Sequence, residues 1–173
     1  NVGRNVSQKN QLELVEIFSH CNYKDWELKI LGNGPLHQEL IEKTKELNLQ
    51  QHVQILDFSK EIDTFYSEAT IFAFTSLYEG FPNALVEAMA HGLPCVSYDC
   101  PTGPADIIKD GVNGFIVPKR DAQALALKMQ TFIESPELAK QLGEAGNKLY
   151  KTQYTIKVFE KRMQQIIKES LVA

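Results

Sequence analysis

The 173-residue chain lacks the features that mark several common protein classes. It has only three cysteines, without CxxC or Cys/His ligand spacing, so neither a disulfide scaffold nor a structural zinc site is indicated. No apolar run approaches the roughly 20 residues that span a bilayer, and no signal-peptide pattern opens the sequence. The net charge of −4 gives no general attraction to nucleic acid or to an anionic membrane. We therefore expect an intracellular soluble domain with reduced, unreactive thiols.

The bulk composition bounds the size of the folded unit. With 43% hydrophobic residues, the chain fits one globular domain with a normal core, or one lobe of a larger protein. The sequence opens at Asn1 without an initiator Met, which favours a fragment. It contains no low-complexity segment and no convincing internal repeat.

Apolar strand-like runs alternate with segments of helical periodicity, which indicates βαβ units and a parallel sheet. Strands are expected at residues 27–31, 53–56, 70–74, 94–98 and 115–117. Helices are expected at residues 8–20, 35–47, 61–68, 82–90 and 105–109. The remainder, from residue 121 to 170, is helical in pattern, with breaks at 135–136 and 153–155.

The loops that follow the strands hold the unusual residues. In an open parallel sheet, ligands bind beyond the carboxyl ends of the strands, where these loops converge. One edge of the sheet is therefore expected to carry the loops at 3–9, 32–34, 57–60, 75–81 and 99–103.

Several familiar motifs are absent from this edge. Gly32-Asn33-Gly34 follows a strand, but His37 stands where the third glycine of a dinucleotide fingerprint would be. There is no Walker A pattern, no G-x-S-x-G elbow and no H-E-x-x-H helix. No two aspartates are spaced as D-x-D, which weighs against a diphosphate held through a metal ion. We expect the two glycines to form a tight turn, and direct contact with a ligand stays open.

Glu79 and Glu87 carry the most information. Glu79 lies in a turn after an apolar run, and Glu87 lies about 7 Å beyond the start of the helix that this turn opens. Asn83 and Glu87 are an i,i+4 pair on one face of that helix, whereas Leu85 points elsewhere, as a core residue would. The amides at the helix start suit an anionic linker such as a diphosphate. The two carboxylates can then accept hydrogen bonds from hydroxyls on either side of it.

Arg4 and Lys9 flank a short polar loop between a presumed first strand and a helix. The planar fork of an arginine and the point charge of a lysine suit diphosphate oxygens at such a loop. The alternative is that both are ordinary solvated charges, which are abundant on protein surfaces.

The histidines and aromatic residues give weaker signals. The four histidines lie at element ends or on polar helix faces, where surface or capping roles are expected. Phe65 and Tyr66 have helical spacing, so we expect them to pack in the core.

The sequence contains, in this order, Gly3-Arg4 with Lys9, Leu31-Gly-Asn-Gly-Pro35, Phe74-Thr-Ser76, Glu79-Gly-Phe-Pro82, Glu87-Ala-Met-Ala-His-Gly-Leu-Pro94, Gly103-Pro104 and Asp110-Gly-Val-Asn-Gly-Phe-Ile-Val117. This series resembles the C-terminal domain of the retaining glycosyltransferases of family four, which have the GT-B architecture. The resemblance runs from residue 1 to about 150, in the family's order and spacing, and includes its E-x7-E element.

The resemblance implies a Rossmann-like α/β lobe, a three-layer sandwich with a parallel sheet of about six strands and helices on both faces. Arg4 and Lys9 match the basic pair that neutralises the nucleotide diphosphate. Glu79 matches the glutamate that contacts the donor sugar, and Glu87 matches the one that holds the ribose. The other implied donor-binding residues are Gly80, Phe81, Pro82, Asn83 and Ala84 near the diphosphate and sugar, and Gly32, Asn33 and Phe58 near the base.

The implied reaction moves a hexose or N-acetylhexosamine from a nucleotide diphosphate, with UDP favoured, to an acceptor hydroxyl with retention at the anomeric carbon. Arg4, Lys9 and the helix start would stabilise the leaving diphosphate. Glu79 would orient the donor in a front-face reaction rather than act as a nucleophile. Neither a cofactor nor a metal ion is implied. The segments 80–83 and 99–104 are similar to those of bacterial transferases that build capsule, lipopolysaccharide or lipid-linked oligosaccharides.

The family carries a second, N-terminal lobe that supplies most of the acceptor site. Residues 1–173 are therefore expected to be the C-terminal nucleotide-sugar-binding domain, inactive alone, with 155–170 as a terminal helix that often crosses back to the other lobe. The expected partners are the nucleotide sugar, the missing domain and an acceptor glycan of the lipid-linked kind, but no nucleic acid. The expected location is the cytoplasm, with the parent enzyme at the inner membrane face.

Other interpretations stay open. A sugar-nucleotide epimerase and a phosphorylase-like enzyme use the same two-lobe architecture, although acid/base residues for the first and a pyridoxal lysine for the second do not stand out. A non-catalytic nucleotide-binding module with the same fold is the third.

Overall fold

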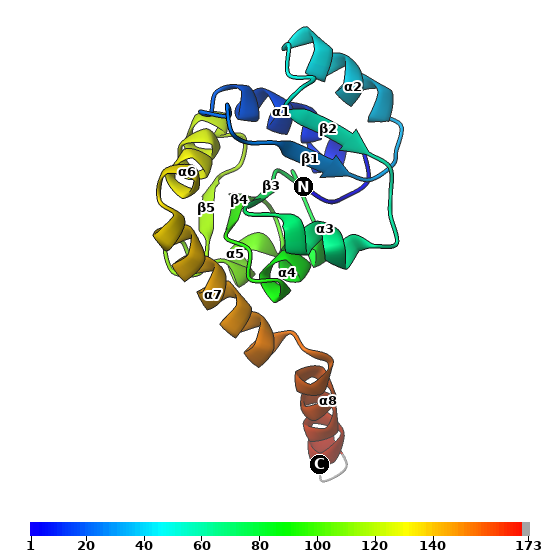
Figure 1. The fold of residues 1–173 in the computed structure, drawn as a ribbon. Helices are drawn as coiled ribbons and strands as arrows, with labels where there is room; N and C mark the ends of the chain where they lie inside the picture. The colour runs from blue at the N-terminus through cyan, green and yellow to red at the C-terminus, as the bar shows by residue number, and fades with distance from the viewer. Residues whose placement is uncertain (171–173) are drawn as a thin grey trace.

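Strands and helices alternate along the chain in the computed structural model, which describes residues 1–170 (Figure 1). The strands are β1 (Leu28–Leu31), β2 (Val53–Leu56), β3 (Phe72–Phe74), β4 (Cys95–Asp99) and β5 (Phe115–Pro118). The helices are the 3-10 turn η1 (Ser7–Lys9), α1 (Gln11–Ser19), α2 (His37–Glu46), α3 (Ile62–Glu68), α4 (Asn83–Ala90), α5 (Pro104–Ile107), α6 (Ala122–Glu134), α7 (Pro136–Gln153) and α8 (Ile156–Ser170). The expected domain extends to residue 173, so its last three residues lie outside the described part.

The strands pair in parallel, as predicted, but they form two groups. β1 pairs with β2, and β4 lies between β3 and β5. Between the groups, Val2 makes a single parallel bridge to Leu31. The Asn1 ammonium donates to the Lys29 carbonyl at 2.8 Å, and the Asn1 side chain donates to the Ala73 carbonyl at 2.8 Å. The described residues thus hold five strands in two groups rather than the predicted single sheet of about six, and Val2 contributes one bridge rather than a strand between the groups.

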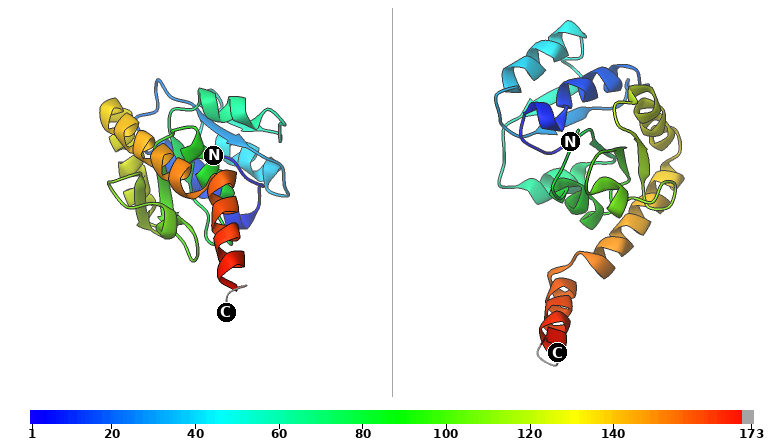
Figure 2. Two further views of the ribbon diagram at one scale, coloured as in Figure 1. Left: turned by 90° about the horizontal axis from the view of Figure 1, so that it is seen from below. Right: turned by 180° about the vertical axis from the view of Figure 1, so that it is seen from behind.

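The breaks in the C-terminal helical region fall where the sequence predicts them. Asp121 caps α6 by accepting a hydrogen bond from the Ala124 amide at 2.9 Å. Pro136 occupies the first turn of α7, where its missing N–H costs nothing. α8 then projects away from the rest of the molecule (Figures 1 and 2) and buries none of its residues.

Helices cover both faces of the strands, which gives the predicted three layers (Figure 2). Successive residues of a strand point to opposite faces, so Phe72 and Phe74 face one apolar cluster and Ala73 faces the other. The Ala73 cluster includes residues of α1, α2 and α6, and the Phe72 cluster includes residues of α3, α4 and α5. These two cores fix where the strand ends and helix starts lie.

The three cysteines are free and buried. Burial raises the pKa of the Cys21 thiol to about 11, and burial also raises the pKa of Cys95 and Cys100. Because the thiolate is the reactive form, all three are poor nucleophiles at neutral pH.

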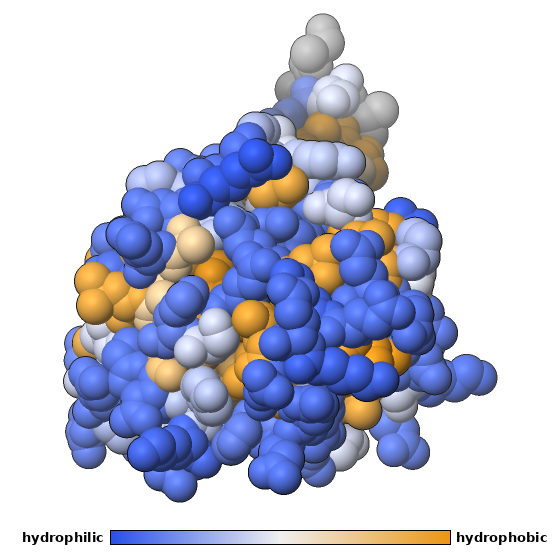
Figure 3. All heavy atoms as spheres, turned by 90° about the horizontal axis from the view of Figure 1, so that it is seen from above, coloured by the Kyte–Doolittle hydropathy of each residue, from blue (hydrophilic) through white to orange (hydrophobic). Residues whose placement is uncertain are grey.

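The face of the molecule shown in Figure 3 is mainly polar. Seen from above the view of Figure 1, hydrophilic residues predominate and the apolar areas are separated by polar ones (Figure 3). Within residues 1–170, none of the helices combines the length and hydropathy required to cross a bilayer.

Two glycines let α7 approach the end of α4 closely. Gly143 and Gly146 are both buried on α7. A Cβ atom on Gly143 would lie only 2.1 Å from the Gly92 carbonyl oxygen, just beyond α4. A Cβ atom on Gly146 would meet the flexible Met89 side chain at 3.3 Å. α7 therefore holds the C-terminal end of α4 through backbone contact at Gly143.

We predict that Gly143→Ala lowers the free energy of unfolding by about 1–3 kcal/mol, even though alanine favours a helix, because the backbone must separate. Gly146→Ala is the matched control and should stay within about 1 kcal/mol of the parent, since Met89 can move aside. Urea denaturation of the two variants provides the comparison. Equal stability of both would contradict this account of the contact between α7 and α4.

Candidate functional site

The loop before α1 and the loop after β3 are joined at the carboxyl edge of the strands. The Leu77 amide donates to the Gln8 carbonyl at 2.8 Å, and the Gln8 side chain donates to the Tyr78 carbonyl at 2.8 Å. The Thr75 hydroxyl donates to the Lys9 carbonyl at 2.9 Å. Segments about 70 residues apart in sequence thus form one surface, as the sheet topology predicts.

A short ion pair lies within this surface. Lys9 Nζ is 2.6 Å from Glu79 Oε1, and the two side chains are 20% and 6% exposed. Lys9 Nζ also lies 5.5 Å from the centre of the Phe74 ring, within range of a cation–π contact. Two residues that were predicted to bind different parts of a donor are therefore each other's partners. Arg4 is exposed, and no ion pair to it is found among residues 1–170.

The Gly32-Asn33-Gly34 turn packs against the first loop of the chain. A Cβ atom on Gly32, whose φ is +149°, would lie 2.0 Å from the Gly3 carbonyl oxygen. A Cβ atom on Gly34 would lie 2.4 Å from the Asn5 carbonyl oxygen. These close approaches explain both glycines without a ligand.

Asn33 and Phe58 bring the turns after β1 and β2 together. The Asn33 side-chain oxygen accepts a hydrogen bond from the Phe58 amide at 2.7 Å. The Phe58 ring is 64% exposed. An exposed aromatic ring beside a glycine turn offers a flat apolar surface at this edge.

The start of α4 is held by the neighbouring loop. Pro82 precedes the helix without a side-chain cap. The Leu85 and Val86 amides donate to the Pro82 carbonyl at 3.0 and 3.2 Å, and the Asn83 amide donates to the Phe81 carbonyl at 3.0 Å. Among the described residues, the Ala84 amide is the one in this first turn without an acceptor. A Cβ atom on Gly103, whose φ is +110°, would lie 2.5 Å from Pro82 Cδ. Gly80, Phe81 and Asn83 are exposed and Ala84 is partly buried. The five residues predicted at the diphosphate therefore surround an accessible helix N-terminus.

Thr102 shows backbone strain next to this helix start. Its φ of +60° is in the left-handed region, which is unusual for a β-branched residue. Its hydroxyl donates to the Glu79 carbonyl, and the Glu79 amide donates to the Pro101 carbonyl at 3.4 Å. The strained loop thus fixes the backbone on both sides of Glu79.

Glu87 lies on the exposed face of α4, as predicted. Asn83 and Glu87 are exposed, whereas Leu85, Ala88 and Met89 are fully buried. The Tyr66 hydroxyl donates to Glu87 Oε2 at 2.9 Å. Tyr66 packs in the core as expected, but its contact with a candidate site residue was missed. No local pattern indicates it, because the two residues are 21 positions apart.

A cavity of about 460 Å³ lies away from these residues. It is lined by residues such as Lys29, Thr70 and Ile71, at or before the starts of β1 and β3, and by none of the predicted donor-binding residues. Tyr66 lines it as well. Its size alone does not make it a better candidate, since the carboxyl edge carries the charged groups and the open helix start. Within the described residues, no cluster of three or more His, Cys, Asp or Glu side chains could hold a metal ion.

Sequence comparison identifies similar proteins. Amylovoran biosynthesis glycosyltransferase AmsD of Erwinia amylovora is 37% identical over 145 residues, which cover 84% of this chain and 41% of that protein. The N-acetylgalactosamine-N,N'-diacetylbacillosaminyl-diphospho-undecaprenol 4-alpha-N-acetylgalactosaminyltransferase of Campylobacter jejuni is 31% identical over 140 residues, or 81% of this chain and 38% of that protein. The chain thus spans less than half the length of these two relatives.

Structure comparison supports the fold. Anabaena Alr3699/HepE, solved in complex with UDP, superposes with a TM-score of 0.89 at 22% identity, over 97% of this chain and 48% of that one. This likeness confirms the predicted Rossmann-like α/β fold. Residues 1–149 also match the family model described as "Glycosyl transferases group 1", which is well over half of the chain. The chain therefore belongs to the group 1 glycosyltransferases.

Proposed function

We propose that this chain is the donor-binding domain of a retaining glycosyltransferase that moves a hexose or N-acetylhexosamine from a UDP donor to an acceptor hydroxyl. The observation that carries the proposal is the Lys9–Glu79 ion pair beside the open start of α4. It joins the basic loop and the E-x7-E segment at the carboxyl edge, where α/β folds bind nucleotides. The family match and the UDP held by Alr3699/HepE support this choice.

The diphosphate is proposed to lie at the start of α4. Arg4 is exposed, and Lys9 can share its charge between Glu79 and a phosphate oxygen. The Ala84 amide at the start of α4 adds a donor, and the positive end of the helix dipole favours the phosphate charge. These groups stabilise the charge that develops on the leaving UDP, so no metal ion is required in this mechanism.

The two glutamates are proposed to bind either end of the donor. Glu79 accepts hydrogen bonds from the sugar hydroxyls while Lys9 and the strained loop at Thr102 hold it in place. Glu87 binds the ribose from the exposed face of α4, and the base lies between Gly32-Asn33 and the Phe58 ring. Glu79 orients the donor and is not a nucleophile.

The remainder of the protein is proposed to supply the acceptor site. The two relatives are more than twice as long as the matched region, which is consistent with a second lobe. The apolar residues of α8 are exposed, with Ile156 at 76% and Phe159 at 64%, as expected for a terminal helix that packs on such a lobe. Bacterial surface polysaccharide or a lipid-linked glycan is the proposed acceptor, because the relatives are named for amylovoran biosynthesis and for a diphospho-undecaprenol acceptor. The enzyme would then act at the cytoplasmic face of the membrane.

In the full-length protein, the double variant Arg4→Met with Lys9→Met should have a kcat/KM lower by about 10³-fold or more. The reason is that two positive charges no longer stabilise the leaving diphosphate. Steady-state transfer assays measure the change. Arg4→Met alone leaves the Lys9–Glu79 pair intact, so its loss of about 10²-fold should come without a change in thermal unfolding.

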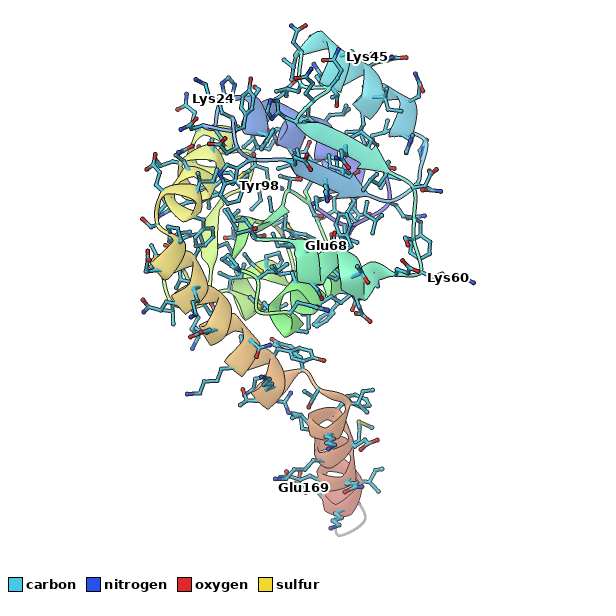
Figure 4. All side chains as sticks on the ribbon, in the orientation of Figure 1. Lys24, Lys45, Lys60, Glu68, Tyr98 and Glu169 are labelled. Atoms are coloured by element: carbon cyan, nitrogen blue, oxygen red, sulfur yellow. The ribbon has the colours of Figure 1, made fainter. Side chains whose placement is uncertain are left out.

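The matched control removes two other positive charges, at Lys24 and Lys45. Both are exposed and lie in the upper part of Figure 4, near the α1–β1 connection and in the last turn of α2. Lys24→Met with Lys45→Met should keep near-normal turnover. Near-normal turnover of the Arg4 and Lys9 variant would instead refute the assignment.

Isothermal titration of the full-length protein should show UDP binding at least about tenfold more tightly than uridine, because the diphosphate engages Arg4, Lys9 and the helix start. Added salt should reduce the difference. If neither ligand binds, a non-catalytic module becomes the better account.

The transferred sugar should keep its anomeric configuration, and it should leave the donor only when an acceptor is present. Proton NMR of the product reports the anomeric coupling constant. An inverted product would contradict the retaining assignment, and a changed nucleotide sugar formed without acceptor would favour an epimerase.

A further inference from the structure

The carboxylate of Glu87 is held from a second helix. Tyr66 on α3 is 1% exposed, and its hydroxyl donates to Glu87 Oε2 at 2.9 Å. The Ala84 carbonyl lies farther away, at 3.3 Å. A charged acceptor at the shorter distance makes the stronger bond, so the hydroxyl proton points to Glu87. Burial, followed by the charge of Glu87, raises the pKa of Tyr66, which therefore stays protonated and remains a donor.

The Tyr66 ring is itself fixed by its neighbours. It packs against Phe72 at 5.9 Å between ring centres and stacks on His91 at 5.1 Å with an interplanar angle of 24°. Because a carbonyl oxygen only accepts, the 2.9 Å contact from His91 Nδ1 to the Glu87 carbonyl places the proton on Nδ1. His91 Nε2 lies 3.5 Å from Asp63, which is also on α3. The phenol thus has little freedom to follow a moving carboxylate.

We infer that Tyr66 is a positioning residue for nucleotide recognition: by holding Oε2 of Glu87, it aims Oε1 at the ribose diol of the donor. This rests on the proposed ribose contact of Glu87. An exposed glutamate otherwise loses rotamer freedom when it binds a ligand, and that loss reduces affinity. Tyr66 removes most of this loss before the nucleotide arrives.

The inference predicts a specific effect on hydroxyl recognition. Wild-type protein should bind UDP about tenfold or more tightly than 2′-deoxy-UDP or 3′-deoxy-UDP, because the hydroxyls bond to a charged acceptor. Tyr66→Phe should lower the affinity for UDP about fivefold to tenfold. The affinity for the deoxy analogue that lacks the hydroxyl bound by Glu87 should stay nearly unchanged. The preference of Tyr66→Phe for UDP over that deoxy analogue should therefore fall towards the preference measured for Glu87→Ala.

The experiment measures the dissociation constants of UDP and both deoxy analogues in the full-length protein by calorimetry, with thermal unfolding recorded for each variant. Tyr98→Phe is the matched control, since it also removes the hydroxyl of a fully buried tyrosine. Tyr98 lies on β4 and is labelled in Figure 4. It should keep the wild-type ratio. In the double variant, Tyr66→Phe should add nothing to Glu87→Ala, because the two side chains act as one unit.

The outcomes separate this inference from the proposed function. If wild-type protein binds UDP no better than either deoxy analogue, the ribose role of Glu87 fails and the inference fails with it. If Glu87→Ala removes the preference and Tyr66→Phe keeps it, the proposed function stands and Tyr66 only packs the core. Equal weakening of all three ligands by Tyr66→Phe also overturns the inference, because a general structural defect would not single out the hydroxyls.

Discussion

The ion pair between Lys9 and Glu79 is the contact on which the rest of the carboxyl edge depends. Its oxygen and nitrogen are 2.6 Å apart, and the Glu79 side chain is only 6% exposed. A carboxylate with so little solvent requires a partner, since an unpaired buried charge is strongly destabilising. The pair therefore joins the loop before α1 to the loop after β3. A third loop, at Thr102, holds the Glu79 backbone through a hydrogen bond from the Thr102 hydroxyl to the Glu79 carbonyl. The candidate donor site is preorganised by these contacts between loops.

Close packing at four glycines supports this arrangement of the loops and of α4. The first loop rests on Gly32 and Gly34, and the start of α4 rests on Gly103, in places where no side chain would fit. Gly143 does the same for the far end of α4. The helix that carries Glu87 is thus held at its start by the Pro82 ring against Gly103 and at its far end by backbone contact at Gly143. Because these close contacts leave little room for the start of α4 to shift, they favour precise binding of a diphosphate there.

The sequence predicted most of the elements and the exposed face of α4, because both follow from local periodicity. Breaks near Pro136 and residue 154 were also correct, since helix interruption is a local property. The pairing of Lys9 with Glu79 and of Tyr66 with Glu87 could not be predicted, because these contacts join residues 70 and 21 positions apart. The division of the strands into two groups was missed for the same reason: strand pairing depends on distant segments. The individual roles of the site residues stay predictions.

The central claim is that the diphosphate and ribose of a UDP donor lie along the start and exposed face of α4. A crystal structure of the full-length protein with UDP tests it most directly. The account predicts phosphate oxygens within hydrogen-bonding distance of Arg4, Lys9 and the amides near Ala84, with the ribose hydroxyls at Glu87. UDP bound instead in the cavity beside Lys29 and Ile71, or at any place without contact to Lys9 and Glu87, would contradict it.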